Sequence, residues 1–273
     1  MAGGHWMIRT VRSGKVIEKS QFYVGPRKPR SPKKKGSTSA ARKDKNMNTA
    51  IRNLARIINC NWSRGDILLT LTYDERHIPE TSETAEHLCA LFWRRLGRTL
   101  KEVNVRLCGF WTACDKDENG NSVRLHHHCV LSAAGIDVKW NEDGTFDTAS
   151  VGGRTLSDIW GRGTVNVELL REQDDYTPIA AYILRQVVSG EDKKKWHASR
   201  DLEKPVVESE IITVSPRELR APGGALVSEI GRYDAETGSH YIRYIRRPKC
   251  AKVGGSKERS VWEPVAGEEG EAI

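Results

Sequence analysis

The fold is decided by the stretch LHHHCVL, residues 125–131. Apolar residues around a histidine triplet predict a β-strand, in which successive side chains point to opposite faces of the sheet. One face is mostly apolar and is predicted to pack against the core; it holds Leu125, His127, Cys129 and Leu131. The opposite face places two imidazoles side by side; it holds Arg124, His126, His128 and Val130.

Two imidazoles on one face of a strand are typical of a divalent metal site, because neutral histidine is a common metal ligand. The sequence therefore indicates His126 and His128 as metal ligands and assigns His127 to the core. The alternative is a histidine-rich strand edge that binds metal without a function. The triplet alone leaves both interpretations open, and the rest of the chain favours the first.

Positive charge is concentrated near the N-terminus. The chain has 273 residues and a formal net charge of +8, and residues 26–46 carry nine basic side chains against one acidic side chain. The cations at the start of this segment are Arg27, Lys28, Arg30, Lys33, Lys34 and Lys35. Such a proline-containing basic segment cannot bury apolar surface, so we expect a disordered arm that binds the phosphates of nucleic acid. A solubilising linker is the alternative.

The cysteines and the hydropathy pattern indicate a cytosolic protein. Six cysteines are present and none forms a Cys-x-x-Cys pair. Cys60, Cys89 and Cys129 lie among apolar residues, as expected for reduced thiols in a core. No segment has the length and apolar character of a membrane span or a secretory signal, so no membrane partner is expected.

Alternating apolar patterns predict an α/β (α+β) domain. Helices are predicted over residues 49–59, 83–102, 156–160 and 178–189. Strands are predicted over residues 67–73, 103–114, 164–170, 206–214 and 241–244, with one or two short strands within residues 1–25. The turn signal Asn119-Gly120 joins strand 103–114 to the histidine strand as a β-hairpin.

These elements lead us to expect a central antiparallel sheet with the histidine strand in its middle and helices mainly on one face. The other face would be open and would carry the site. The domain is expected to cover residues 48–250, after an N-terminal segment 1–47 and before a flexible tail 251–273. Residues 135–153 are polar and glycine-rich and are expected to form an insertion.

A second pattern lies on the predicted helix 178–189. At about 100° per residue, its apolar side chains form one wide arc and its polar side chains the opposite arc. Tyr182 lies in the polar arc, with Arg185 one turn later on the same face. A phenol next to a guanidinium suits phosphate chemistry, because arginine binds phosphate oxygens through two parallel hydrogen bonds. For this residue alone, an exposed tyrosine without a role is the alternative.

The order of these patterns resembles the HUH endonucleases, and within them the rolling-circle replication initiators of bacterial plasmids and phages, including gene II-type proteins of filamentous phages. The order is an apolar strand at residues 68–73, then a His-x-His strand, then a helix with a tyrosine. The resemblance covers roughly residues 48 to 210. It extends to Asn61-Trp62 with Asp66, to Trp160 with Gly163, and to the segment Ser199–Pro205.

The resemblance implies a ferredoxin-like replication-initiator fold and a role for each matching residue. His126 and His128 would hold the metal, and Tyr182 would attack a DNA phosphodiester to form a 5′-phosphotyrosyl bond and a free 3′-hydroxyl. Arg200, in the segment after the tyrosine helix, would contact DNA. The family usually has a hydrophobic residue where this chain has His127, and often a lysine where it has Arg185. Arginine binds phosphate but does not release a proton near neutral pH.

A third metal ligand is expected from the strand that pairs with the histidine strand. Asp115, at the end of the predicted strand, is the first choice, followed by Glu118 and then Cys114. Histidine and carboxylate ligands together suit Mg²⁺ or Mn²⁺ better than a structural zinc site. The expected cofactor is therefore Mg²⁺ or Mn²⁺.

Two other classes of function compete with this interpretation. A hydrolase of the His-x-His type would need a β/α barrel with further histidines at strand ends. A non-catalytic DNA-binding regulator of replication would leave the joint occurrence of His126, His128 and Tyr182 unexplained. The chain has no GxxxxGK[ST] motif for a helicase. For a replication initiator, the expected partners are therefore single-stranded or origin DNA together with a host helicase and polymerase in a bacterial cytosol.

Overall fold

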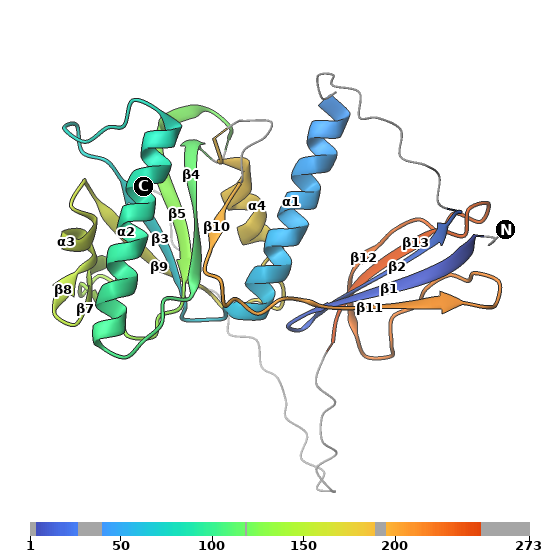
Figure 1. Cartoon of the computed structure of the whole chain (residues 1–273). Helices are drawn as coiled ribbons and strands as arrows, with labels where there is room; N and C mark the ends of the chain where they lie inside the picture. The colour runs from blue at the N-terminus through green and yellow to red at the C-terminus, as the bar shows by residue number, and fades with distance from the viewer. Residues whose placement is uncertain (1–3, 27–39, 118, 189–194, 247–273) are drawn as a thin grey trace, which may run out of the picture.

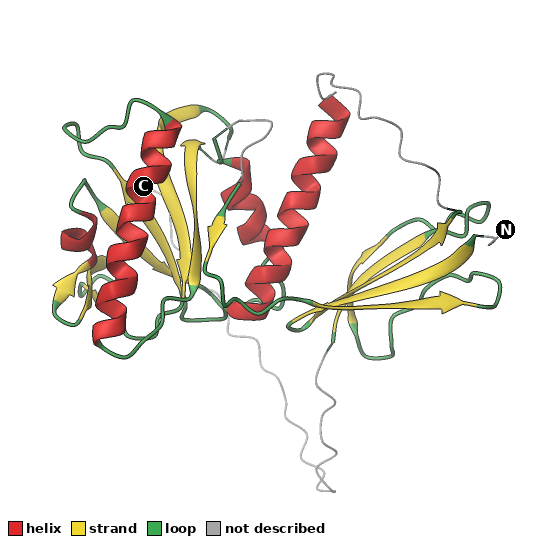
Figure 2. Ribbon diagram, viewed as in Figure 1, coloured by secondary structure: helices red, strands yellow, loops and turns green. Residues whose placement is uncertain are grey.

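The computed structural model describes residues 4–26, 40–117, 119–188 and 195–246 (Figure 1). Within these residues the chain forms four helices and three antiparallel sheets (Figure 2). The predicted α+β class is therefore confirmed. None of the described helices combines the length and the apolar character that crossing a membrane requires.

The central sheet has five antiparallel strands, with the histidine strand in the middle as predicted. In spatial order they are β10 (His197–Ala198), β4 (Gly109–Lys116), β5 (Ser122–Leu131), β3 (Ile67–Thr72) and β9 (Val165–Leu169). β4 and β5 form the predicted hairpin. The register pairs His128 with Thr70 on one side and with Thr112 on the other, and it pairs His126 with Cys114.

Helices cover both faces of the central sheet, not mainly one face as predicted. α2 (Ser82–Glu102) and α3 (Leu156–Trp160) pack on the face that carries Cys129 and Leu131. On the other face lie α1 (Ala40–Asn61) and α4 (Thr177–Arg185), whose apolar side chains contact those of the sheet. The physical reason is that Phe110 and Val130 make this second face apolar as well, so it must also be buried.

The helix α1 differs from the prediction at its start. The apolar stripe Ile51, Leu54, Ala55 and Ile58 is buried as the sequence indicated. The helix nevertheless begins at Ala40 and not at Thr49, so part of the predicted disordered arm, residues 40–46, is helical. Alanine, arginine and lysine in that part favour the helix and tolerate exposure to water. The six arm cations from Arg27 to Lys35 lie outside the described residues.

A second five-stranded sheet joins strands from the two ends of the chain. In spatial order it contains β11 (Val206–Ile212), β1 (His5–Ser13), β2 (Val16–Val24), β13 (His240–Ile245) and β12 (Leu226–Ile230). The predicted boundary after residue 47 would place β1 and β2 in one segment and their pairing partners β11 and β13 in another. Sequence patterns did not reveal this pairing.

Buried ionic groups connect the second sheet to the two helices α1 and α4. Glu18 of β2 is buried and accepts hydrogen bonds from Arg56 of α1 at 2.9 and 2.8 Å. Arg243 of β13 donates to Asp175 at 2.7 Å, and Asp175 accepts a hydrogen bond from the backbone of Thr177 at the start of α4. The helix that carries Tyr182 is therefore tied at its N-terminal end to the second sheet.

The predicted insertion contributes a small third sheet. It contains β6 (Asp137–Trp140), β7 (Phe146–Val151) and β8 (Arg154–Thr155). Ala149 and Val151 of β7 are buried in the core beneath α2 and α3. This segment is therefore part of the packed domain, although its polar and glycine-rich sequence suggested an insertion.

Candidate metal and nucleophile site

The three histidines of β5 divide between the two faces as the alternation rule predicts. His127 is fully buried on the α2 side, where its Nε2 lies 2.7 Å from the Tyr73 hydroxyl and its Nδ1 lies 3.2 Å from the Thr112 carbonyl oxygen. Burial lowers the pKa of His127 to about 3, so the ring is neutral at physiological pH. Because a carbonyl only accepts, Nδ1 donates to Thr112 and Nε2 accepts from Tyr73. His127 is a structural residue of the core.

Replacement of His127 by alanine is expected to destabilise the fold by roughly 2–5 kcal/mol, because it leaves a cavity and removes the partner of the Tyr73 hydroxyl at 2.7 Å, which keeps only its 3.4 Å hydrogen bond to the Ala85 carbonyl oxygen. The measurement is urea unfolding followed by circular dichroism. The matched control is His126→Ala, which removes the same group from a half-buried position on the other face. A His127→Ala variant as stable as the control would contradict the structural role.

His126 and His128 lie next to each other on the opposite face, with ring centroids 5.0 Å apart. His126 is half-buried, and its Nδ1 lies 3.1 Å from the Arg124 carbonyl oxygen, which leaves Nε2 with a lone pair for a metal. His128 is only 4% exposed, and burial lowers its pKa to about 4. His128 is therefore neutral at physiological pH, as a metal ligand must be.

Cys114 is the residue that the structure brings to the two histidines. One ligand atom of Cys114, His126 and His128 each lies within 4.8 Å of the other two. The antiparallel register explains this, because directly paired residues share a face and Cys114 pairs with His126. Asp115, the first choice from the sequence, lies at an irregularity in the strand and does not belong to the group. Glu118 lies outside the described residues.

The chemistry of the three groups favours a softer metal than the sequence suggested. Burial raises the pKa of the Cys114 thiol to about 12, so in the absence of a metal the thiol is protonated. Thiolate and imidazole together suit Zn²⁺ and similar ions, whereas Mg²⁺ prefers oxygen ligands. Asp115 still offers such an oxygen, since its Oδ1 is buried and has no hydrogen-bond partner among the described residues.

Gln186 is a further polar group of the site that the sequence analysis did not single out. Its side chain is 3% exposed, and its Oε1 lies 3.2 Å from His128 Nε2. Its Nε2 donates to the carbonyl oxygen of Tyr182, one turn earlier in the chain. The sequence could have indicated Gln186, because it belongs to the same polar arc of the predicted helix as Tyr182. In the structure, helix α4 ends one residue before Gln186. The backbone then pairs with β4, where Val187 faces Cys114.

Helix α4 places the ring of Tyr182 next to His128. The Tyr182 side chain is 41% exposed, and its ring centroid lies 5.4 Å from that of His128. Arg185, on the same helix, is also exposed, while Ile183 and Leu184 are buried against the sheet. Tyr176 differs, because it is buried and its hydroxyl donates to the Arg171 carbonyl oxygen at 3.1 Å. Of these two tyrosines, only Tyr182 is exposed beside the histidines.

The predicted DNA-binding residue Arg200 lines a separate cavity of about 510 Å³. The cavity lies between α1 and residues 196–205, which include the edge strand β10. Trp196 and Lys204 line it together with Arg200. An aromatic ring with two cations is a common arrangement for binding single-stranded nucleic acid, through stacking on a base and attraction to phosphates.

Comparisons with protein-family models, with curated proteins and with solved structures found no match for this chain. Its function is therefore inferred from the residues of the site and their geometry.

Proposed function

We propose that this protein is a metal-dependent endonuclease that nicks single-stranded origin DNA through Tyr182 and later rejoins strands, as a rolling-circle replication initiator does. The observation that carries the proposal is an exposed tyrosine whose ring centroid lies 5.4 Å from that of His128. Tyr182 comes from a helix that is packed against the sheet and held at its N-terminal end. This arrangement supports a nucleophile held beside a metal site.

In the proposed reaction, the phenolic oxygen of Tyr182 forms a bond to phosphorus while the bond from phosphorus to the 3′ oxygen breaks. The phenol loses its proton, and the leaving oxygen takes up a proton to become a 3′-hydroxyl. The 5′ end stays on the protein as a phosphotyrosine, which retains the ester for later strand joining. A divalent cation held by His126 and His128 would polarise the scissile phosphate and offset its developing charge. Arg185 would bind a flanking phosphate.

The hydrogen-bond partners of the His128 ring would allow either ring nitrogen to carry the proton, as metal binding at the other nitrogen requires. The Gln186 carbonyl oxygen only accepts hydrogen bonds, so His128 Nε2 carries the proton and Nδ1 accepts from the Thr70 hydroxyl at 3.3 Å. If Nε2 held a cation, Nδ1 would carry the proton and donate to Thr70, because a hydroxyl both donates and accepts. Gln186 Oε1 would then be free to serve as a further oxygen ligand.

We expect Cys114 to be the third ligand, which a titration with Co²⁺ can test. A cobalt–thiolate bond produces a charge-transfer band in the near ultraviolet, so the wild-type protein should show this band and Cys114→Ser should lose it. Metal affinity should fall at least about tenfold in that variant, because a ligand is replaced by a weaker one.

Gln186→Ala and Asp115→Ala are the matched controls for this titration, because each removes one alternative oxygen ligand. Both variants should keep the thiolate band. Absence of the band in the wild type, together with weaker cobalt binding in either control, would assign the third position to an oxygen. That result would favour Mg²⁺ or Mn²⁺, the ions expected with a carboxylate ligand.

The experiment that tests the function is a cleavage assay on a random pool of single-stranded oligonucleotides, because the origin sequence is not known. Purified protein with Mn²⁺, Zn²⁺ or Mg²⁺ should become covalently linked to 5′ ends and release strands with a 3′-hydroxyl. A chelator should prevent both events. Cleavage that leaves free 5′-phosphates, or no cleavage with any of the three ions, would contradict the proposal.

A non-catalytic DNA-binding protein with a structural metal is the second candidate. The observation that favours this second candidate is that Cys114 and His128 are both buried, as ligands of a structural zinc site usually are. Such a protein would bind single strands without forming a covalent adduct. A barrel hydrolase of the His-x-His type is not supported, because the His-x-His strand lies in an antiparallel sheet. For the proposed initiator, a host helicase and polymerase in the bacterial cytosol remain the expected partners.

Replacement of Arg200 and Lys204 by glutamine is expected to weaken the binding of single-stranded DNA. It should also reduce the slope of log affinity against log salt by roughly 1.4, since each phosphate contact on a single strand contributes about 0.7. Fluorescence anisotropy at several salt concentrations measures both effects. The control is Arg106→Gln, an exposed arginine paired with Asp201 outside this cavity. An unchanged salt slope in the double variant would show that these cations do not contact phosphates.

A further inference from the structure

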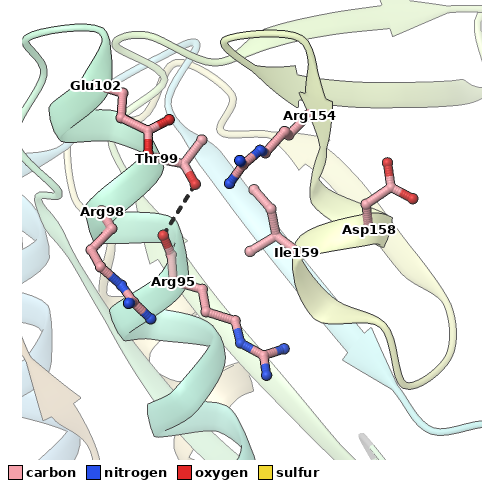
Figure 3. Close-up of a pocket in the computed structure, with 7 residues that line it drawn as sticks. All are labelled: Arg95, Arg98, Thr99, Glu102, Arg154, Asp158 and Ile159. Carbon is pink, nitrogen blue, oxygen red and sulfur yellow. Dashed lines mark hydrogen bonds between the residues drawn. The ribbon is translucent and has the colours of Figure 1, made fainter.

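Figure 3 shows the residues that line a second cavity, of about 500 Å³. The helices that form it pack on the side of the central sheet opposite to helix α4. It is formed between the C-terminal half of α2 and the segment that contains β8 and α3. Three arginines line it: Arg95 and Arg98 from α2, and Arg154 from β8. Both α2 and α3 pack on the Leu131 face of the central sheet, whereas α4 packs on the Val130 face.

The three guanidinium groups have no ion-pair partner within the part of the chain that the structure describes. All three residues are exposed. Figure 3 shows the Arg154 side chain extending from its strand towards α2, across the cavity from Arg95 and Arg98. Two carboxylates, Glu102 and Asp158, also line the cavity, so its wall carries one more cation than anion, and a bound anion would balance this excess.

A general preference of helices for basic residues at their C-terminal ends does not explain this arrangement. The favourable interaction of positive charge with the helix dipole is confined to the last turn, whose basic residue in α2 is Lys101, and Arg95 and Arg98 precede that turn. Arg154 belongs to another element, and the helix dipole of α2 gives no reason for it to line the same cavity. The convergence of the two elements therefore points to a ligand.

We propose that this cavity is a second binding site for phosphate groups, separate from the site at Tyr182. Arginine is suited to phosphate because its planar guanidinium donates two parallel hydrogen bonds to two oxygens. The floor of the cavity contains the buried residues Thr99 and Ile159. Thr99 donates its hydroxyl to the Arg95 carbonyl oxygen at 3.2 Å, so the hydroxyl oxygen can still accept a hydrogen bond.

The remaining lining residues indicate what accompanies the phosphate. Glu102 and Asp158 add two carboxylates to the wall, and they accept hydrogen bonds from hydroxyl or amino groups. Ile159 offers an apolar surface. Phosphate oxygens together with hydroxyl or amino donors are found both in a free nucleotide and in a nucleic acid strand. The site would therefore take phosphate from one of these two sources.

The test compares Arg98→Gln/Arg154→Gln with the wild-type full chain, using inorganic pyrophosphate and a fluorescent single-stranded oligonucleotide as separate probes. The matched control is Arg94→Gln, because Arg94 is exposed on the same helix but does not line the cavity. We expect affinity for at least one probe to fall about tenfold in the double variant and to stay unchanged in the control. Circular dichroism verifies the fold, and Arg154→Gln alone serves if the double variant unfolds.

The two probes distinguish the sources of phosphate. Loss of pyrophosphate binding assigns the site to a free nucleotide or similar compound, and it does so without reference to DNA cleavage. Loss of oligonucleotide binding alone, with a lower salt slope, assigns it to the backbone of DNA. The inference is overturned if neither affinity changes in the double variant, or if Arg94→Gln lowers both affinities equally. All these measurements are independent of whether Tyr182 is a nucleophile.

Discussion

Tyr182→Phe is expected to lower DNA cleavage by at least about a thousandfold, because the substitution removes the oxygen that would attack phosphorus. DNA binding should be retained, since the ring and its contact with His128 remain. The measurement is the amount of covalent protein–DNA adduct after denaturing electrophoresis. Peptide mapping of the wild-type adduct should find the nucleotide on the peptide that contains Tyr182.

Tyr176→Phe is the control for this prediction. It also removes one phenolic hydroxyl, but that hydroxyl is bonded to the Arg171 carbonyl oxygen in a buried position. We expect a loss of about 1 kcal/mol of stability and normal adduct formation. An adduct that persists in Tyr182→Phe and disappears in Tyr176→Phe would transfer the role to Tyr176.

His126→Ala and His128→Ala should each lower metal affinity by at least about a hundredfold, because each removes an imidazole from a site with few ligands. Cleavage should fall in parallel, and excess metal should restore part of it if the site is weakened but not abolished. Isothermal titration with Zn²⁺ and Mn²⁺ measures the affinity.

His87→Ala is the matched control, because His87 is an exposed histidine of α2 on the opposite face of the sheet. It should leave metal binding and cleavage unchanged. Normal metal affinity in both His126→Ala and His128→Ala, with the fold intact, would remove the basis for a metal site on this face.

The part of the site that could be predicted is the part that depends on local geometry. Alternation along one strand separates His127 from His126 and His128, and helical periodicity exposes Tyr182. The structure groups Cys114, and not the predicted Asp115, with the two histidines, and this grouping depends on the register between two strands. A shift of one residue in register moves every side chain to the other face.

The fold was predictable within the same limits. Within residues 67–185 the structure contains the predicted helices and strands near the expected positions, and in addition the three short strands β6, β7 and β8, which were not predicted. The second sheet was not predicted, because it pairs β1 and β2 with strands that follow them by more than 180 residues. Local patterns carry no information on such partners. The helices on the Val130 face could have been inferred from the apolar residues of that face.

The second sheet also sets an order of events on the ribosome. The hairpin of β1 and β2 is synthesised before the central sheet, but its partners β11 and β13 are synthesised after it. All strands of the central sheet lie between them, so this sheet can form while the outer edges of the hairpin are still unpaired. Unpaired strand edges promote association between chains. A nascent chain that stops before Val206 would therefore contain every strand of the central sheet and yet leave the outer edges of β1 and β2 without a paired strand.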